Sequence, residues 1–195
     1  NEAHLLRYCY RVAGTVGLMM SAALDVKNPT ALFHAIDLGI AMQLTNIARD
    51  VREDATMDRR YVPADSIGAV EPVLLVDPTE EVKGKLARSV EHLLLLADMY
   101  YRSGNAGLPF LPFGARTAIF IAGRVYREIG LKIARNRFDV WSRRTMVPLR
   151  TKAIVSILIL LSLPFRPAFW QYRSVHDARL HAHLTDLPFT HSGAA

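Results

Sequence analysis

The sequence predicts an all-α protein, and three observations support that prediction. First, apolar residues recur every three to four positions along most of the 195 residues, a spacing typical of amphipathic helices. Second, no segment shows the alternating pattern of a strand or an Asn-Gly hairpin turn. Third, helix-starting pairs occur at Asn28-Pro29 and Asp77-Pro78, where the first side chain can cap a helix and proline fits its first position.

Four long helices are expected in chain order. Their ranges are His4–Asp25, Asn28–Ala55, Asp77–Asn105 and Phe113–Phe138. The third is expected to end at the glycine of Ser103-Gly104-Asn105, because glycine is the usual residue after the last turn of a helix.

An apolar run from Ala153 to Leu163 follows these helices and ends before Pro164. It is shorter than the roughly 20 apolar residues that span a bilayer. We therefore expect a buried terminal helix, with an interfacial segment as the alternative. No linker divides the sequence, so residues 1–163 are expected to belong to one helical domain and residues 164–195 to form an irregular tail. His181 and His183 in this tail are expected to be solvated rather than to bind a metal.

The composition limits the classes of function. The formal net charge of +6 suits phosphorylated substrates, anionic lipid or nucleic acid. Nucleic-acid binding is not expected, because the basic residues neither cluster with aromatic residues nor follow a known module's spacing. The single cysteine, Cys9, excludes an internal disulfide and is expected to be a small buried group. The predicted location is the cytoplasm, with peripheral contact at the inner face of a membrane as an alternative.

Four polar side chains share one face of the second expected helix, since successive residues are about 100° apart: Gln43, Asn46, Asp50 and Asp54. An apolar stripe lies beside them: Ile40, Leu44, Ile47 and Val51. Carboxylates at i and i+4 repel each other, and a bound cation would remove that repulsion. Mg²⁺ binds one or two carboxylates together with substrate phosphates. We expect Asp50, Asp54 and Asn46 to bind Mg²⁺, or alternatively Mn²⁺, while Gln43 positions a phosphate. The simpler alternative is a solvated acidic patch.

Basic and apolar groups accompany this row. Arg59 and Arg60 follow the carboxylates, and the arginine fork matches phosphate oxygens, although an ordinary charged loop is the alternative. In the first expected helix, small residues gather on one side and would permit close packing of another helix: Ala13, Gly14 and Gly17. A second side forms an apolar wall with a phenol at its end: Tyr8, Val12 and Val16.

These segments together resemble the squalene/phytoene synthase family of head-to-head prenyl transferases. The matching segments are Tyr8–Met20, Gln43–Asp54, Arg59–Pro63, Gly107–Pro109 and Val125–Ile133. The resemblance implies an isoprenoid-synthase-type helical bundle around a central cavity, of which this chain is part. It also implies the phytoene synthase branch: condensation of two geranylgeranyl diphosphates through a cyclopropylcarbinyl diphosphate, with diphosphate release and without NADPH.

The resemblance also implies roles for individual residues. Tyr8 would lie near the allylic cation or the departing diphosphate, and Arg59 would neutralise diphosphate charge. Val12 and Val16 would line the prenyl tunnel, and Tyr126 the cavity wall. Family members carry an earlier aspartate-rich helix that this sequence lacks, so we expect the N-terminal part of the domain to be missing from it. The family also commonly has glycine where this chain has Asp58.

Two alternatives remain open at this point. Within the family, the chain could be a squalene or dehydrosqualene synthase that uses farnesyl diphosphate. Outside enzymes, it could be a non-catalytic helical module that docks carotenoid enzymes at a membrane, as the basic balance and the Ala153–Leu163 run suggest.

Overall fold

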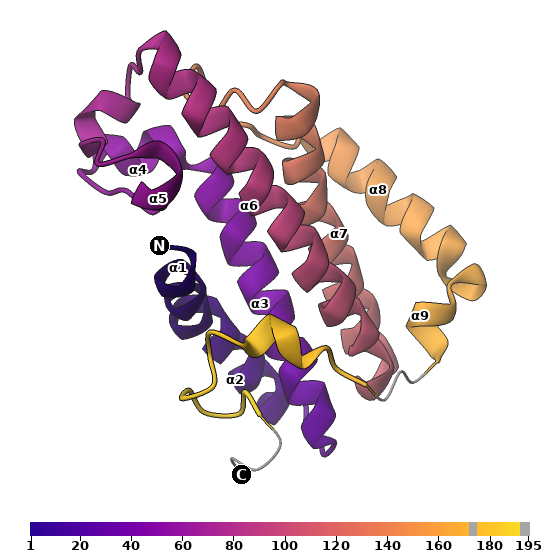
Figure 1. Cartoon of the computed structure of the whole chain (residues 1–195). Helices are drawn as coiled ribbons and strands as arrows, with labels where there is room; N and C mark the ends of the chain where they lie inside the picture. The colour runs from indigo at the N-terminus through magenta and orange to yellow at the C-terminus, as the bar shows by residue number, and fades with distance from the viewer. Residues whose placement is uncertain (172–174, 192–195) are drawn as a thin grey trace.

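The structure is a computed structural model that describes residues 1–171 and 175–191 (Figure 1). Every regular element in these ranges is helical, which confirms the predicted fold class. The α-helices are α1 (Glu2–Cys9), α2 (Thr15–Ala23), α3 (Pro29–Arg49), α4 (Val51–Thr56), α5 (Ala64–Ile67), α6 (Glu80–Ala106), α7 (Phe113–Arg135), α8 (Leu149–Ser162) and α9 (Pro167–Trp170). A π-helical turn (Tyr10–Gly14) joins α1 to α2, and 3₁₀ turns lie at Pro72–Leu75, Leu108–Phe110, Leu163–Phe165 and Ala178–His181.

Helix α3 is the central element of the bundle. It packs against α2, α6 and α7, and Figure 1 shows α6 and α7 running lengthwise beside it. Its apolar stripe is fully buried, as Ile36, Ile40 and Leu44 all have exposed fractions of 0%. By length and composition this helix could also cross a membrane, but 56% of its apolar window is buried within the protein. Burial of this extent is typical of a core helix.

Glycines let the first helical segment lie directly on α3. A Cβ atom at Gly39 would come within 2.2 Å of the Ala13 carbonyl oxygen, and one at Gly17 within 2.2 Å of the Ala35 carbonyl oxygen. No side chain fits at either place, so both positions require glycine. The expected close packing of Ala13, Gly14 and Gly17 is confirmed.

The expected helix ends are confirmed in part. Asn28 caps α3, since its Oδ1 accepts a hydrogen bond from the Thr30 amide at 2.9 Å. The cap predicted at Asp77 is wrong, because Thr79 caps α6 instead. The predicted end at Gly104 is also wrong. Helix α6 continues to Ala106. Gly104 lies inside it, where it serves close packing rather than helix termination, since a Cβ atom there would clash with Leu38.

Helix α8 contradicts the prediction of a buried terminal helix. Leu149, Leu158 and Leu161 are 81%, 60% and 69% exposed, and Ile159 alone is buried within this helix. The physical reason is that α8 contacts α7 along one side, whereas its apolar residues surround the helix on all sides. Figure 1 shows α8 on the outside of α7.

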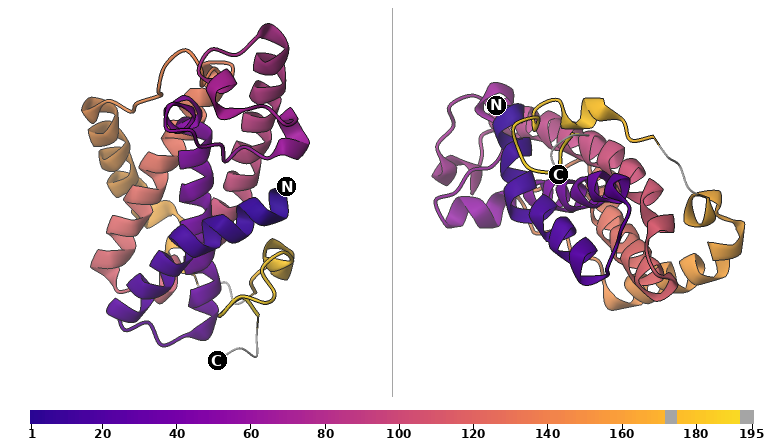
Figure 2. Two further views of the ribbon diagram at one scale, coloured as in Figure 1. Left: turned by 90° about the vertical axis from the view of Figure 1, so that its left-hand side faces the viewer. Right: turned by 90° about the horizontal axis from the view of Figure 1, so that it is seen from below.

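The predicted irregular tail is more ordered than expected. It contains α9 and the Ala178–His181 turn, and Figures 1 and 2 show its last part crossing over the bundle beside α3 and α6. The Tyr100 hydroxyl donates a hydrogen bond to the Leu180 carbonyl oxygen at 2.6 Å. His181 is 2% exposed, so the prediction that it is solvated is wrong, whereas His183 is exposed as expected. Residues 172–174 and 192–195 of the tail lie outside the described ranges.

Candidate active site

An apolar cavity of about 350 Å³ lies beside α3. Its walls come from α2, α3, α7 and the end of α6, with lining side chains that include Val16, Leu38, Met42, Leu111, Ile119 and Tyr126. A cavity of this size and lining fits a hydrocarbon chain better than a polar metabolite. The first helical segment contributes Val16 and Gly17, so the glycine packing described above sets the position of this wall.

The cavity becomes polar at Gln43 and Asn46, which both line it. The Asn46 amide donates to Gln43 Oε1 at 3.4 Å. The Oδ1 atom of Asn46 is buried and has no hydrogen-bond partner among the described residues. Buried polar atoms are normally satisfied, so this oxygen is available to a cation or another ligand.

Asp50 lies at the junction of α3 and α4. Two guanidinium groups bind its carboxylate: Arg49 Nε and Arg144 Nε lie 2.7 Å and 2.8 Å from Oδ1. Burial raises the pKa of Asp50, but the hydrogen bonds from Arg49 and Arg144 outweigh that effect and hold the pKa below its usual range. The carboxylate is therefore ionised at neutral pH and neutralised by arginine.

Asp54 lies one turn further along and has the opposite shift. Burial raises its pKa, and the negative charge of Asp50 raises it further, while Arg59 offsets part of the effect. A divalent cation near both carboxylates would relieve this repulsion. The donor set of Asn46, Asp50 and Asp54 consists of oxygen atoms, which are the ligands that Mg²⁺ prefers. These residues therefore fit a divalent metal, for which Arg144 and Arg49 are the competing cations at Asp50.

A left-handed turn places Arg59 beside Asp54. Asp58 has a φ of 55°, which is the region that favours glycine. The Arg59 amide donates to the Asp54 carbonyl oxygen at 2.9 Å. The turn is thus kept despite aspartate, and Arg59, Asp54 and Tyr61 line one small pocket.

Tyr8 lies next to this group through Tyr61. The two rings stack with their centroids 5.0 Å apart. Burial raises the pKa of Tyr8 to about 12, and hydrogen bonding to Tyr61 and the charge of Asp54 act in the same direction. Tyr8 is therefore a neutral phenol at physiological pH, close to the carboxylates rather than in the apolar cavity.

Val12 and Val16 do not share the wall that helical spacing predicts. Val16 lines the cavity and Val12 is absent from the lining, although the two side chains are similarly exposed, at 46% and 41%. Val12 lies within the π-helical turn, in which the Thr15 amide donates to the Tyr10 carbonyl oxygen, and Val16 lies after it. A π turn holds one extra residue, so it rotates the residues after it by about 100° relative to a continuous α-helix.

The sequence did not predict two side chains that lie near the site, Arg144 and His34. Arg144 binds Asp50 from a loop 94 residues away, and no local pattern connects the two. His34 lines the cavity, and its Nδ1 lies 3.1 Å from Ser103 Oγ on α6. Its position on the buried side of α3 could have been read from helical spacing, but its polar partner could not.

Residues 1–151 match the family model described as squalene/phytoene synthase. The chain belongs to this family. It is 45% identical over 141 residues to the 15-cis-phytoene synthase of Enterobacter agglomerans, an alignment that covers 71% of this chain and 47% of that protein. It is 41% identical over 170 residues to the phytoene synthase of Thermus thermophilus, covering 85% of this chain and 57% of that protein.

Structural similarity agrees with the family assignment. A crystal structure of a dehydrosqualene synthase in complex with ligand superposes with a TM-score of 0.70 and 27% identity. The superposition covers 85% of this chain and 59% of that chain. The chain thus spans about half the length of the relatives it matches, and its membership of the squalene/phytoene synthase family confirms the resemblance noted from the sequence.

Proposed function

We propose that this chain forms part of a phytoene synthase that condenses two molecules of geranylgeranyl diphosphate to phytoene and releases diphosphate. The observation that carries the proposal is an apolar cavity that ends at Gln43 and Asn46, directly before Asp50 and Asp54. This arrangement suits a substrate with a long hydrocarbon tail and an anionic head. The names of the similar bacterial proteins support the same activity.

Some site residues would bind the diphosphate head of the substrate, and others would line the space for its hydrocarbon tail. Asn46, Asp50 and Asp54 would hold Mg²⁺, or alternatively Mn²⁺, which supplies positive charge to the departing diphosphate. Arg59 would neutralise further diphosphate charge, and Gln43 would orient the head group through hydrogen bonds. Because allylic cations react with water, Val16 and Tyr126 serve by keeping the tail region dry. No nicotinamide cofactor is required, since proton loss ends the reaction.

Tyr8 is proposed to act as a neutral hydrogen-bond donor near the diphosphate. Its raised pKa of about 12 keeps the phenol protonated, and a phenolate beside Asp54 would repel the substrate head group. Val12 is absent from the lining of the cavity, so within this chain we assign it no contact with the cavity that Val16 lines.

Product analysis tests the proposal. The protein expressed from its complete gene would be incubated with Mg²⁺ and either geranylgeranyl or farnesyl diphosphate, without NADPH. We expect a C40 hydrocarbon from the first substrate and at least tenfold less product from the second, since tail length changes the buried apolar contact. A C30 product as the main activity would instead support a dehydrosqualene synthase, in keeping with the similar solved structure.

We further propose that α8 rests on the cytoplasmic face of a membrane. The exposed leucines of α8 lie next to exposed basic side chains at its start, Arg150 and Lys152, and such a combination suits anionic lipid. Co-sedimentation with anionic vesicles would fall in a Leu158→Glu, Leu161→Glu double variant and persist in Leu95→Glu, which alters an exposed leucine on α6. The non-catalytic docking module, by contrast, predicts that Asp50→Ala leaves the biological role of the protein intact, and loss of function on that change would argue against it.

A further inference from the structure

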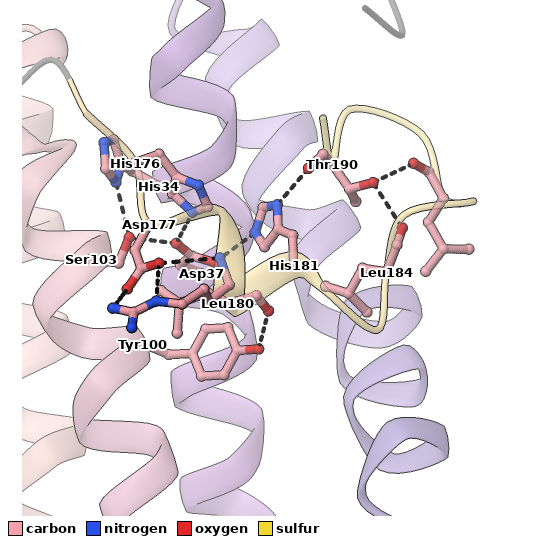
Figure 3. A network of polar contacts seen from close by, with 12 residues as sticks. His34, Asp37, Tyr100, Ser103, His176, Asp177, Leu180, His181, Leu184 and Thr190 are labelled. Carbon is pink, nitrogen blue, oxygen red and sulfur yellow. Dashed lines mark hydrogen bonds and ion pairs between the residues drawn. The ribbon is translucent and has the colours of Figure 1, made fainter. Parts of the chain in front are cut away.

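A second cluster of ionisable side chains lies on the other half of α3, away from the carboxylate row (Figure 3). Asp37 of α3 meets two histidines of the C-terminal segment: His176 Nε2 lies 2.7 Å from Asp37 Oδ2, and His181 Nε2 lies 2.8 Å from Asp37 Oδ1. One ligand atom from each of the three residues lies within 4.8 Å of the others. The proposed condensation uses none of them.

The side chains of the cluster are largely buried. The exposed fractions of the side chains are 0% for Asp37, 8% for His176 and 2% for His181. A buried carboxylate is costly unless it is paired. The partners of Asp37 come from far along the chain, since His176 lies 139 residues and His181 144 residues after it. The ionised form of Asp37 therefore requires a positive charge nearby, either a proton on an imidazole or a metal ion bound by the two imidazoles.

The tautomer of His181 restricts what that charge can be. Its Nδ1 lies 2.9 Å from the Thr190 carbonyl oxygen, and a carbonyl oxygen only accepts, so Nδ1 must carry the hydrogen. In a neutral His181 the Nε2 atom then presents a lone pair to Asp37 Oδ1. Two lone pairs at 2.8 Å repel each other, so either a proton or a metal ion lies between them.

The surroundings match those of a metal-binding histidine. Histidines that bind a metal through one nitrogen commonly donate the other N–H to a backbone carbonyl, as His181 does to Thr190. The carboxylate is oriented in the same way, because Ser103 Oγ donates a hydrogen bond to Asp37 Oδ2 at 2.5 Å. Figure 3 shows these supporting groups arranged around the cluster.

We propose that Asp37, His176 and His181 bind a Zn²⁺ ion that joins the C-terminal segment to α3. The two Nε2 atoms and one oxygen of Asp37 supply three protein ligands, and a water would complete the tetrahedron that Zn²⁺ prefers. Imidazole ligands favour Zn²⁺ over Mg²⁺, whose ligands are oxygens. A single divalent ion balances the buried carboxylate and satisfies the lone pairs of both imidazoles.

The role of this ion is structural. The C-terminal segment covers α3 and α6 at the level of His34, whose ring centroid lies 5.4 Å from that of His176. Since His34 also lines the cavity, the ion would fix the segment behind the cavity wall. The site does not depend on the proposed function, because its ligands lie outside the carboxylate row.

Metal analysis of the protein expressed from its complete gene, without a histidine tag, tests the proposal. We expect about one Zn²⁺ per chain after gel filtration. Replacement by Co²⁺ would give the visible absorption of a tetrahedral nitrogen and oxygen site, and a strong chelator would lower the melting temperature. His176→Gln and His181→Gln would each lower the zinc content at least tenfold, whereas the control His183→Gln, an exposed residue of the same segment, would keep it.

The proposal is overturned if the wild-type protein, grown and refolded with Zn²⁺, contains less than about 0.1 ion per chain and its melting temperature ignores the chelator. A proton on His181 would then fill the same position. It is equally overturned if both glutamine variants retain zinc. Because the cobalt spectrum and the chelator response use the wild-type protein, poor folding of a variant does not prevent the decision.

Discussion

Helix α3 carries two ionised aspartates, Asp37 in its first half and Asp50 at its C-terminal cap, but the surrounding protein neutralises the two in different ways. Asp37 has no exposed surface, and the imidazoles of His176 and His181 enclose it. Asp50 keeps 17% of its side chain exposed, and its partner Arg144 is 42% exposed. We expect Arg144, at this open edge, to move when a metal and a diphosphate arrive, and the enclosed imidazoles to stay in place. The comparison separates a region suited to binding a substrate from one suited to holding the fold together.

The largest expected effect comes from removing the enclosed charge. Asp37→Asn would leave the ligands of the cluster without their anion, and breaking a buried charged pair typically costs about 3–5 kcal/mol. The same change at Asp50, Asp50→Asn, would cost less, about 1.5–3 kcal/mol. Urea unfolding monitored by circular dichroism measures both values. Equal losses at the two positions would break the comparison.

Enzyme activity, unlike stability, should depend most on the carboxylates near Asp50. Asp54→Asn would lower the rate of product formation by about 100- to 1,000-fold, the range found when one group that stabilises transition-state charge is removed, while the unfolding midpoint stays close to the wild-type value. Asp65→Asn is the matched control, since this carboxylate is 70% exposed and lies outside the site. Steady-state assays with geranylgeranyl diphosphate give both rates, and an unchanged rate in Asp54→Asn would remove this carboxylate from the site.

The glycine contact at Gly39, between the two aspartates, should have an intermediate effect. Gly39→Ala would force apart α3 and the Ala13 carbonyl, and overpacking of this kind costs about 1–3 kcal/mol. In Gly114→Ala, on an open surface of α7 where a Cβ atom meets nothing within 4 Å, no loss is expected. Thermal melting of the two variants provides the measurement. A stable Gly39→Ala protein would mean that the cavity wall adapts more readily than its packing indicates.

The smallest expected effect tests whether arginine and metal compete at Asp50. Arg144→Gln removes one of the two guanidinium groups, and an ion pair this exposed contributes at most about 1 kcal/mol. Binding of Mn²⁺ alone would therefore become tighter by up to about fivefold, as measured by electron paramagnetic resonance titration. The same substitution at Arg150, on the surface of α8, should leave Mn²⁺ affinity unchanged. Weaker binding in Arg144→Gln would show that the guanidinium supports the metal instead of competing with it.

The open end of α3 could be predicted from the sequence because its chemistry is local. Helical spacing alone placed Gln43, Asn46, Asp50 and Asp54 on one face, and the α3–α4 junction at Asp50 preserves the hydrogen bond from its amide to the Asn46 carbonyl oxygen. The relative placement of Val12 and Val16 could not be predicted, because nothing in the local pattern marks the π turn that contains Val12.

The Asp37 cluster could not be predicted, because its members are distant in the chain. Asp37 reads as an isolated polar residue within α3, and His181 as part of a polar tail. Their contact depends on the C-terminal segment folding back over α3, and contacts between residues so far apart in the chain cannot be read from a local sequence pattern. The prediction that α8 is buried was wrong for a related reason. An apolar run predicts a helix but does not reveal which neighbours cover it.

A crystal structure with Mn²⁺ and a non-reacting geranylgeranyl thiodiphosphate tests the contrast between the two aspartates most directly. The account predicts an anomalous manganese peak about 2.1 Å from oxygens of Asp50 and Asp54, with the Arg144 guanidinium moved from Asp50 to the diphosphate and the Asp37 cluster unchanged. Diphosphate bound elsewhere, with Asp50 still held by Arg49 and Arg144, would contradict it.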